Sequence, residues 1–163
     1  MKTENSPGAA ETKHGPGVRI HPPLIYAASI LCGIGLDKLR PQPMPFDIQG
    51  PLYAAAILLV VLLLAALCLY EFHKAGTDVR PDKPDSALIT SGPYCFTRNP
   101  LYIGLTLVQV AAAAWLDNAW VLGMAPVSVF IINMYAIKRE ERYLEQLFGQ
   151  AYLDYKQQVR RWL

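Results

Sequence analysis

Charged and aromatic side chains concentrate in two segments of an otherwise apolar sequence. The first segment contains Tyr94, Arg98 and Tyr102. The second contains the adjacent acids Glu140 and Glu141. Each segment adjoins one end of a long apolar stretch, so both are expected at the same face of a membrane. The sequence therefore predicts a polar pocket at the membrane interface.

A sulfonium methyl donor such as S-adenosylmethionine would find suitable groups in such a pocket. It needs a carboxylate for its ammonium, a cation or free backbone N–H for its carboxylate, and aromatic or apolar walls for adenine. Aromatic faces also attract the sulfonium cation. Methyl transfer to a carboxylate needs little proton chemistry, so alignment and exclusion of water would supply most of the rate. The residues of these types are Glu140, Glu141, Arg98, Tyr94, Phe96 and Tyr102.

Each of these residues also has a purely structural interpretation. Asn99 followed by Pro100 is typical of a helix N-cap with proline at the first helical position. Arg98 fits the positive charge that flanks membrane helices on their cytoplasmic side. Glu140 and Glu141 could pair with neighbouring basic residues on a solvated helical turn. The residues alone thus predict a charged pocket without naming a reaction.

Composition and apolar periodicity predict the helices that would position this pocket. The chain is 53% hydrophobic and only 17% charged, which indicates an all-α membrane protein rather than a soluble domain. Residues 51–70 carry no charge and are long enough to cross about 30 Å of hydrocarbon. We expect about four transmembrane helices and a C-terminal amphipathic interfacial helix, over residues 22–39, 51–72, 100–116, 118–137 and 138–161 respectively.

Charge distribution predicts the orientation and the partners. Residues 1–19 resemble a flexible tail, and residues 20–163 are expected to form a single membrane domain. Of the 15 Lys and Arg residues, all but Lys38 and Arg40 fall on the side that holds both termini, which places the termini in the cytoplasm. The net charge of +2 is too small for a nucleic-acid binder, so the expected partners are the bilayer and a lipid-like small molecule.

Several isolated residues receive structural interpretations. Gln109 and Asn133 are polar within apolar spans and should face other helices or a cavity. Gly149 is expected to interrupt the amphipathic helix, and Arg161 with Trp162 suits an interfacial anchor. No metal site is predicted, because neither the histidines nor the cysteines have ligand spacing. The cysteines are interpreted as small buried hydrophobes, and they are Cys32, Cys68 and Cys95.

Three motifs in order resemble the isoprenylcysteine carboxyl methyltransferase family and its relatives, the membrane phospholipid methyltransferases. The resemblance covers residues 79–162, about half of the chain. Together the motifs are specific, whereas each alone is weak. They are Leu88-Ile-Thr-Ser-Gly-Pro-Tyr94, then Arg98-Asn-Pro-Leu-Tyr102 with Gly104, then Glu140-Glu141 followed by Phe148-Gly149, Tyr152 and Tyr155.

This resemblance implies an S-adenosylmethionine-dependent methyltransferase that acts on a lipid-like or isoprenoid carboxylate or amine at the cytoplasmic face. Arg98 and Asn99 would occupy the catalytic positions, with Asn99 where the eukaryotic carboxyl methyltransferases usually have His. The substrate-binding arginine of that family falls at Ala136, which argues against a prenylcysteine acceptor. By the same resemblance, the cofactor-binding residues would be Leu88, Ile89, Tyr94, Pro100, Tyr102, Glu140 and Glu141.

Two other functions compete with methyl transfer. Sterol reductases resemble this family in the same C-terminal region, so a membrane reductase that uses NADPH is one alternative. A membrane scaffold that keeps the fold without the chemistry is the other. The presence of both Arg98 and Glu140 favours the methyltransferase over the scaffold.

Overall fold

Every regular secondary-structure element in the described part of the chain is a helix. The computed structural model describes residues 20–44, 50–77 and 86–163, and none of these lies in a strand. The all-α prediction is therefore confirmed for the described residues, whereas the predicted tail, residues 1–19, lies outside them. The helices are α1 (Pro22–Leu39), α2 (Gly50–Ala75), the 3-10 helix η1 (Gly92–Cys95), α3 (Pro100–Trp115), α4 (Ala119–Gly123), α5 (Ala125–Ile132), the π-helix η2 (Asn133–Ile137), α6 (Lys138–Phe148) and α7 (Gln150–Gln158).

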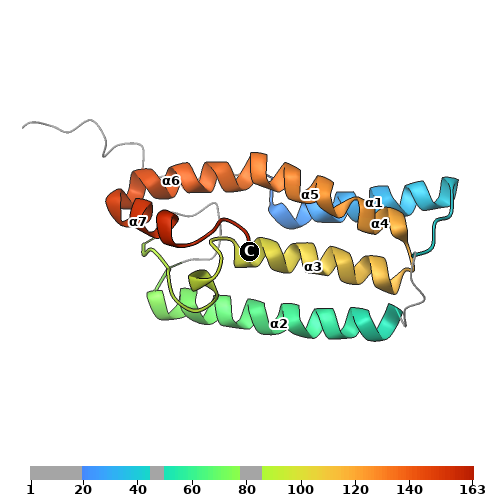
Figure 1. The fold of residues 1–163 in the computed structure, drawn as a ribbon, viewed down its shortest axis with the longest axis horizontal. Coiled ribbons are helices and arrows are strands. Elements are labelled where there is room, and N and C mark those ends of the chain that lie inside the picture. Colours follow the sequence, from blue (N-terminus) through green and yellow to red (C-terminus); the bar gives the residue numbers. More distant parts are fainter. Residues whose placement is uncertain (1–19, 45–49, 78–85) are drawn as a thin grey trace, which may run out of the picture.

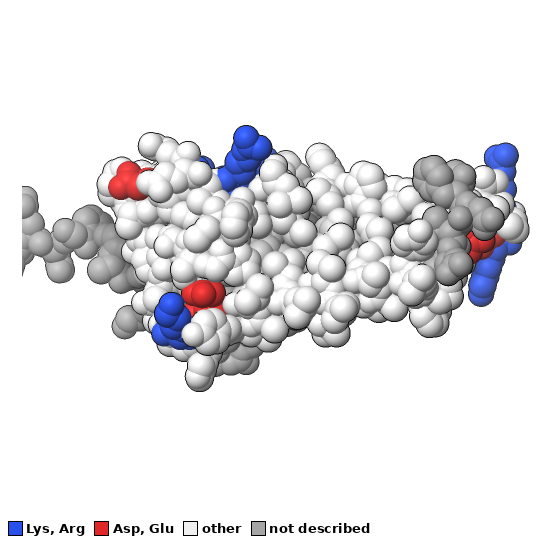
Figure 2. Space-filling view, turned by 60° about the horizontal axis from the view of Figure 1, so that its bottom comes forward, with Lys and Arg blue, Asp and Glu red and all other residues white. Residues whose placement is uncertain are grey.

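Within residues 20–44, 50–77 and 86–163, two helical runs are long and apolar enough to cross a membrane. One is α2, and the other is the 30-residue run from Ala119 to Phe148 that joins α4 to α6. The apolar helix α3 is shorter, with 16 residues. On the face shown in Figure 2, the charged side chains lie toward the two ends of the elongated molecule, and a broad uncharged band separates them. This distribution suits a protein whose middle lies in hydrocarbon.

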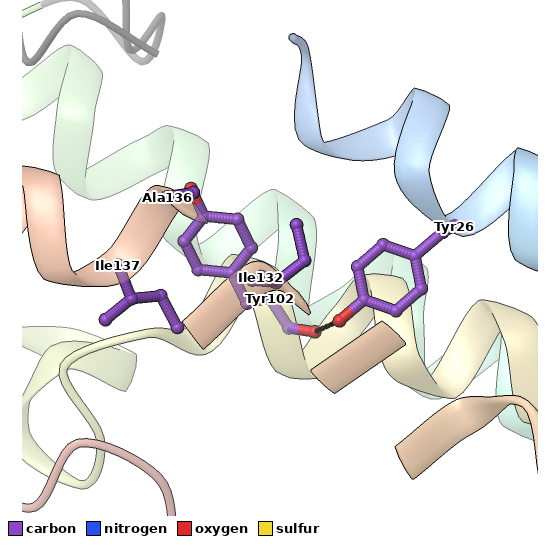
Figure 3. Close-up of a cluster of buried hydrophobic side chains, with 5 residues drawn as sticks. All are labelled: Tyr26, Tyr102, Ile132, Ala136 and Ile137. Carbon is purple, nitrogen blue, oxygen red and sulfur yellow. Dashed lines mark hydrogen bonds between the residues drawn. The ribbon is translucent and has the colours of Figure 1, made fainter. Parts of the chain in front are cut away.

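Helix α3 occupies the centre of the bundle. Figure 1 shows α3 between α2 and the run from α4 to α6, and α1 packs on α3, α4 and α5. Close packing of α1 on α4 depends on Gly33, since a Cβ added there would lie 2.7 Å from the Cα of Val121. The main core cluster consists of Tyr26, Tyr102, Ile132, Ala136 and Ile137 (Figure 3).

The reversal between α3 and α4 lies where the sequence predicts it, at residues 116–118. Asp117 adopts the left-handed conformation with φ of 49°, and the Asn118 side chain caps α4 by accepting from the Val121 N–H at 3.0 Å. Gln109, which is fully buried, donates to the Val121 carbonyl at 3.1 Å. This contact confirms that Gln109 faces another helix.

The structure differs from the predicted fourth span, residues 118–137, in two ways: the helix is interrupted within the span, and it continues past residue 137. Met124 separates α4 from α5, because Pro126 in the first turn of α5 lacks the N–H that a continuing helix would use. No break occurs at residue 138, since η2 leads directly into α6. The helix ends instead at Gly149, where a φ of +55° confirms the predicted interruption.

The burial predicted for the cysteines is correct for only one of them. Cys68 is fully buried, but Cys32 and Cys95 are exposed. Cys32 lies on an outward face of α1, and Cys95 lies in the short helix η1, so an apolar neighbourhood in sequence did not bury either side chain. For Cys32 the prediction was wrong because hydrophobicity along an apolar helix does not distinguish the face that packs on the protein from the face that points outward.

Candidate functional site

A cavity of about 550 Å³ lies at the end of the bundle where the η1 loop, α6 and α7 meet the ends of α1, α2 and α3. Its volume is in the range that protein sites for small ligands occupy. Of the residues predicted for the site, Phe96 is exposed and lies outside this lining. The other nine line this one cavity, although the roles assigned to them stay predictions. They are Leu88, Ile89, Tyr94, Arg98, Asn99, Pro100, Tyr102, Glu140 and Glu141.

Arg98 lies in the loop between η1 and α3, with its side chain only 9% exposed. Its Nη1 pairs with Glu141 Oε1 at 2.9 Å and donates to the Tyr152 hydroxyl at 3.4 Å. Its Nε is buried and has no hydrogen-bond partner among the described residues. Because buried donors are almost always paired, this N–H is a candidate to donate a hydrogen bond to a ligand.

Glu141 is a buried carboxylate held between two guanidinium groups. Its side chain is 8% exposed, and Arg161 donates to both of its oxygens, from Nε at 2.8 Å and from Nη2 at 2.6 Å. Arg98 pairs with it from the cavity. The interpretation of Glu141 as a solvated, locally paired acid is therefore wrong, since both of its partners lie outside α6.

Glu140 presents the second carboxylate to the cavity. The Tyr102 hydroxyl donates to Glu140 Oε1 at 2.5 Å, so a side chain from α3 fixes this acid on α6. Pro100 begins α3 at a position where the missing N–H costs no helical hydrogen bond, and this places Tyr102 in the first turn. The carboxylate of Glu140 is thus the one that suits a cationic group in the cavity.

Asn99 is buried at the N-cap position of α3, but its side chain forms no capping bond within the described structure. The Nδ2 group instead donates to the backbone carbonyl of Arg161 at 2.9 Å. The capping interpretation is therefore wrong for the side chain, although the predicted proline at the first helical position is confirmed. The Asn99 amide holds the end of the chain against the site.

Aromatic rings form part of the cavity wall. Phe72 from α2 meets Tyr94 edge to face, with ring centroids 6.0 Å apart. The Tyr155 hydroxyl donates to the Tyr94 carbonyl at 2.8 Å. Burial, with the Glu141 charge adding to it, raises the pKa of Tyr152 to about 12, and burial also raises the pKa of Tyr94 and Tyr155. These phenols are therefore neutral at physiological pH.

The structure adds residues that the sequence did not assign to the site. Phe72, Tyr152 and Tyr155 line the cavity, and Arg161 supports it through Glu141. The two tyrosines belong to the third resemblance motif, which was the only signal for them. Arg161 gave none, because a basic residue beside Trp162 at the end of an apolar chain is also typical of an interfacial anchor.

The family model for phospholipid methyltransferases matches residues 51–151, well over half of the chain. This chain belongs to the phospholipid methyltransferase family. The match includes all of the predicted site residues, from Leu88 to Glu141.

Curated proteins show the same likeness over shorter stretches. An uncharacterised protein of Haemophilus influenzae is 48% identical over 65 residues, which are 39% of this chain and 100% of that protein. Protein-S-isoprenylcysteine O-methyltransferase of Rattus norvegicus is 31% identical over 111 residues, 65% of this chain and 39% of that protein. The corresponding Dictyostelium discoideum protein is 32% identical over 84 residues, 47% of this chain and 32% of that protein. The chain thus spans about a third of the length of the named methyltransferases, and no solved structure matches it.

Proposed function

We propose that this family member transfers a methyl group from S-adenosylmethionine to the carboxylate or amine of a lipid-like or isoprenoid acceptor. The observation that carries the proposal is the convergence of Arg98, Tyr102 and Glu140 on one cavity at the end of the bundle. These residues come from three separate elements, and their meeting provides a cation, an anion and an aromatic surface together. Family membership supports the same reaction class.

The residues of the cavity fit this cofactor. Glu140 offers a carboxylate for the cofactor's ammonium, and the unpaired Nε of Arg98 offers a donor for its carboxylate. Phe72 and Tyr94 provide aromatic surface for the adenine ring. When bound, the cofactor supplies an electrophilic methyl group on a sulfonium. Glu141 is less suited to hold the ammonium, because both of its oxygens already accept from guanidinium groups.

The chain's contribution to the rate is alignment and exclusion of water. The Arg98–Glu141 pair and the Tyr102–Glu140 hydrogen bond fix the polar groups before any ligand arrives. The neutral tyrosines add no competing nucleophile, because their raised pKa values keep them protonated. An acceptor carboxylate attacks with its own oxygen and needs no base, which suits a cavity without an activated side chain.

Apolar residues in the cavity lining favour a chain-like acceptor. The lining includes Val61 and Leu64 of α2 and Leu101 and Val108 of α3. The interval from Leu101 to Val108 corresponds to about 10 Å along the helix axis. Ala136, at the position expected for a substrate-binding arginine, is fully buried in the core cluster. No cation therefore replaces that arginine at this position, which favours a lipid acceptor other than a prenylcysteine carboxylate.

We further propose that residues 20–163 form one membrane domain with four crossings and both termini in the cytoplasm. The 18 residues of α1 and the 16 of α3 would span about 27 Å and 24 Å, close to the thickness of hydrocarbon. Single-cysteine variants in intact cells would test this topology. Cysteines at the exposed positions Gln146 and Leu116 should react with impermeant reagents from opposite sides, and labelling from one side only would contradict it.

Methyl transfer can be tested with membranes that contain the protein. Incubation with S-adenosylmethionine carrying a radioactive methyl group should label the lipid fraction, and the Glu140→Gln variant should reduce this labelling strongly. Arg142→Gln is a matched control, because Arg142 is exposed on the same helix. Lipid labelling that equals that of membranes without the protein would contradict the proposal. A parallel titration with NADPH tests the reductase, which tighter binding of NADPH would favour.

A further inference from the structure

The last residues of the chain return across the site after α7 ends at Gln158. We call residues 159–163 the C-terminal strap. Its backbone carbonyls accept hydrogen bonds from the loop that leads into α3. The bonds are Arg98 N–H to Arg160 O at 2.9 Å, Thr97 Oγ1 to Arg161 O at 3.1 Å, and Asn99 Nδ2 to Arg161 O at 2.9 Å. The strap thus fixes the segment that carries both predicted catalytic residues.

The side chains of the strap reach two further parts of the site. The Arg161 guanidinium binds both oxygens of Glu141, and its Nη1 donates to Asn133 Oδ1 at 3.3 Å. Asn133 opens the π-helix η2, which immediately precedes the glutamates of α6. Trp162 packs against the core cluster that contains Tyr102. The strap therefore contacts the loop before α3, the π-helix and the core in a single crossing.

The two guanidinium groups have different relations to the cavity. Arg98 lines the cavity, whereas Arg161 approaches Glu141 as a second partner and is not among the lining residues. The Arg161 guanidinium donates two parallel hydrogen bonds, one to each oxygen of the Glu141 carboxylate. Because the guanidinium is planar, the two bonds together fix the plane of the carboxylate. Glu141 in turn holds Arg98 Nη1, which determines where the unpaired Nε of Arg98 points. Arg161 therefore orients Arg98 through Glu141.

We propose that Arg161 is a positioning residue of the cofactor site and that the C-terminal strap is part of this site. The strap lies beyond residues 51–151, the part of the chain that the family model matches. The inference rests on the proposed function, since the ligand whose affinity it concerns is S-adenosylmethionine. It assigns to Arg161 an effect on ligand affinity that an interfacial anchor would not have.

The first test compares the affinity of purified full-length variants for S-adenosylmethionine at a temperature where each is folded. Arg161→Gln should raise the Kd by about ten- to a hundredfold, the usual effect of losing hydrogen bonds to a charged group. Arg161→Lys keeps the charge without the two-pronged geometry, and its Kd should lie between those of the unsubstituted protein and Arg161→Gln. Arg142→Gln removes the same charge from an exposed position of α6 and should leave the Kd unchanged. Equal Kd values for Arg161→Gln and Arg142→Gln would overturn the inference.

A double-mutant cycle tests whether Arg161 acts through Glu141. If it does, adding Arg161→Gln to Glu141→Gln should leave the Kd of the single Glu141→Gln variant nearly unchanged. Full additivity of the two effects would show that Arg161 acts by another route and would overturn the inference. If Arg161→Gln does not fold, Arg161→Lys replaces it in both tests. Failure of the unsubstituted protein to bind S-adenosylmethionine would instead reject the proposed function.

Discussion

Two buried polar clusters among the described residues differ in how completely their hydrogen-bonding groups are paired. In the middle of the bundle, Gln109 donates to the Val121 carbonyl and accepts from the Ser128 hydroxyl at 2.8 Å, and Gln109 and Ser128 are fully buried. We call this the closed cluster. At the end of the bundle, Arg98 and Arg161 flank Glu141 beside the cavity, and Arg98 Nε has no partner in the described structure. We call this the open cluster.

The difference separates a structural role from a functional one. The two hydrogen bonds of Gln109 join α3 to the α4–α5 segment, so the closed cluster stabilises helix packing in a medium that offers no competing water. The open cluster leaves a buried donor beside a cavity, an arrangement that costs stability unless a ligand satisfies it. Burial and polarity alone would not have distinguished the two clusters.

The largest expected effect comes from removing the cavity cation. Arg98→Ala should lower kcat/KM for methyl transfer by about a hundredfold or more, because it removes the unpaired donor and leaves Glu141 with one of its two partners. Arg98→Lys should remain strongly impaired, since an ammonium cannot reproduce the guanidinium geometry. Steady-state kinetics in detergent would measure both, and near-normal activity of Arg98→Ala would contradict the role of the open cluster.

Disruption of the closed cluster should lower the stability of the protein without changing its affinity for the ligand. Gln109→Leu should lower the free energy of unfolding by about 1–2 kcal/mol, because it leaves the Ser128 hydroxyl and the Val121 carbonyl without this partner. The Kd for S-adenosylmethionine should stay unchanged, since Gln109 is not among the cavity-lining residues. Reversible denaturation and a binding titration would provide the two values. A raised Kd with an unchanged free energy of unfolding would contradict the structural role of the closed cluster.

A smaller effect is expected from the hydroxyl that fixes Glu140. Tyr102→Phe keeps the ring in the core cluster and removes only the donor to Glu140 Oε1. The Kd for S-adenosylmethionine should rise by about tenfold, the value of one hydrogen bond to a charged acceptor. Isothermal titration calorimetry would measure it. An unchanged Kd would indicate that Glu140 needs no support from α3 to hold the ligand.

The smallest effect concerns alkaline pH. The pKa of Tyr152 is raised from 10.0 to about 12, so above pH 10 the unfolded state loses a proton that the folded state keeps. Stability should therefore be independent of this group below pH 10 and should fall as the pH rises from 10 to 12. Tyr152→Phe should reduce that fall, as thermal denaturation across the pH range would show. An identical pH profile for both proteins would contradict the raised pKa.

Local signals predicted the helices, and pocket residues followed from motifs. Pro100 marked the start of α3 because proline is well suited only to the first helical turn. Gly149 marked the end of α6 because it can adopt a positive φ. The site residues predicted from the resemblance share one cavity because the motifs adjoin the helix ends that meet there, whereas Phe96, which belongs to no motif, points outward.

Long-range pairing left no signal in the sequence. The residues of the π-helix η2 are of the same types as those of an α-helix. Apolar periodicity therefore could not predict that η2 is a π-helix or that the helix continues without a break into α6. Arg161 pairs with Glu141 across 20 residues, and a terminal arginine has many possible partners. Asn99 resembled a helix cap because it directly precedes Pro100. Its side-chain amide instead donates to the backbone carbonyl of Arg161, which is distant in the sequence.

The central claim, that the open cluster binds the methyl donor and the closed cluster does not, is tested most directly by one set of titrations. S-adenosylmethionine should bind the purified protein saturably, Arg98→Ala should weaken this binding by at least about tenfold, and Gln109→Leu should leave it unchanged. Equal affinities in all three proteins, or the same weakening in both variants, would contradict the claim.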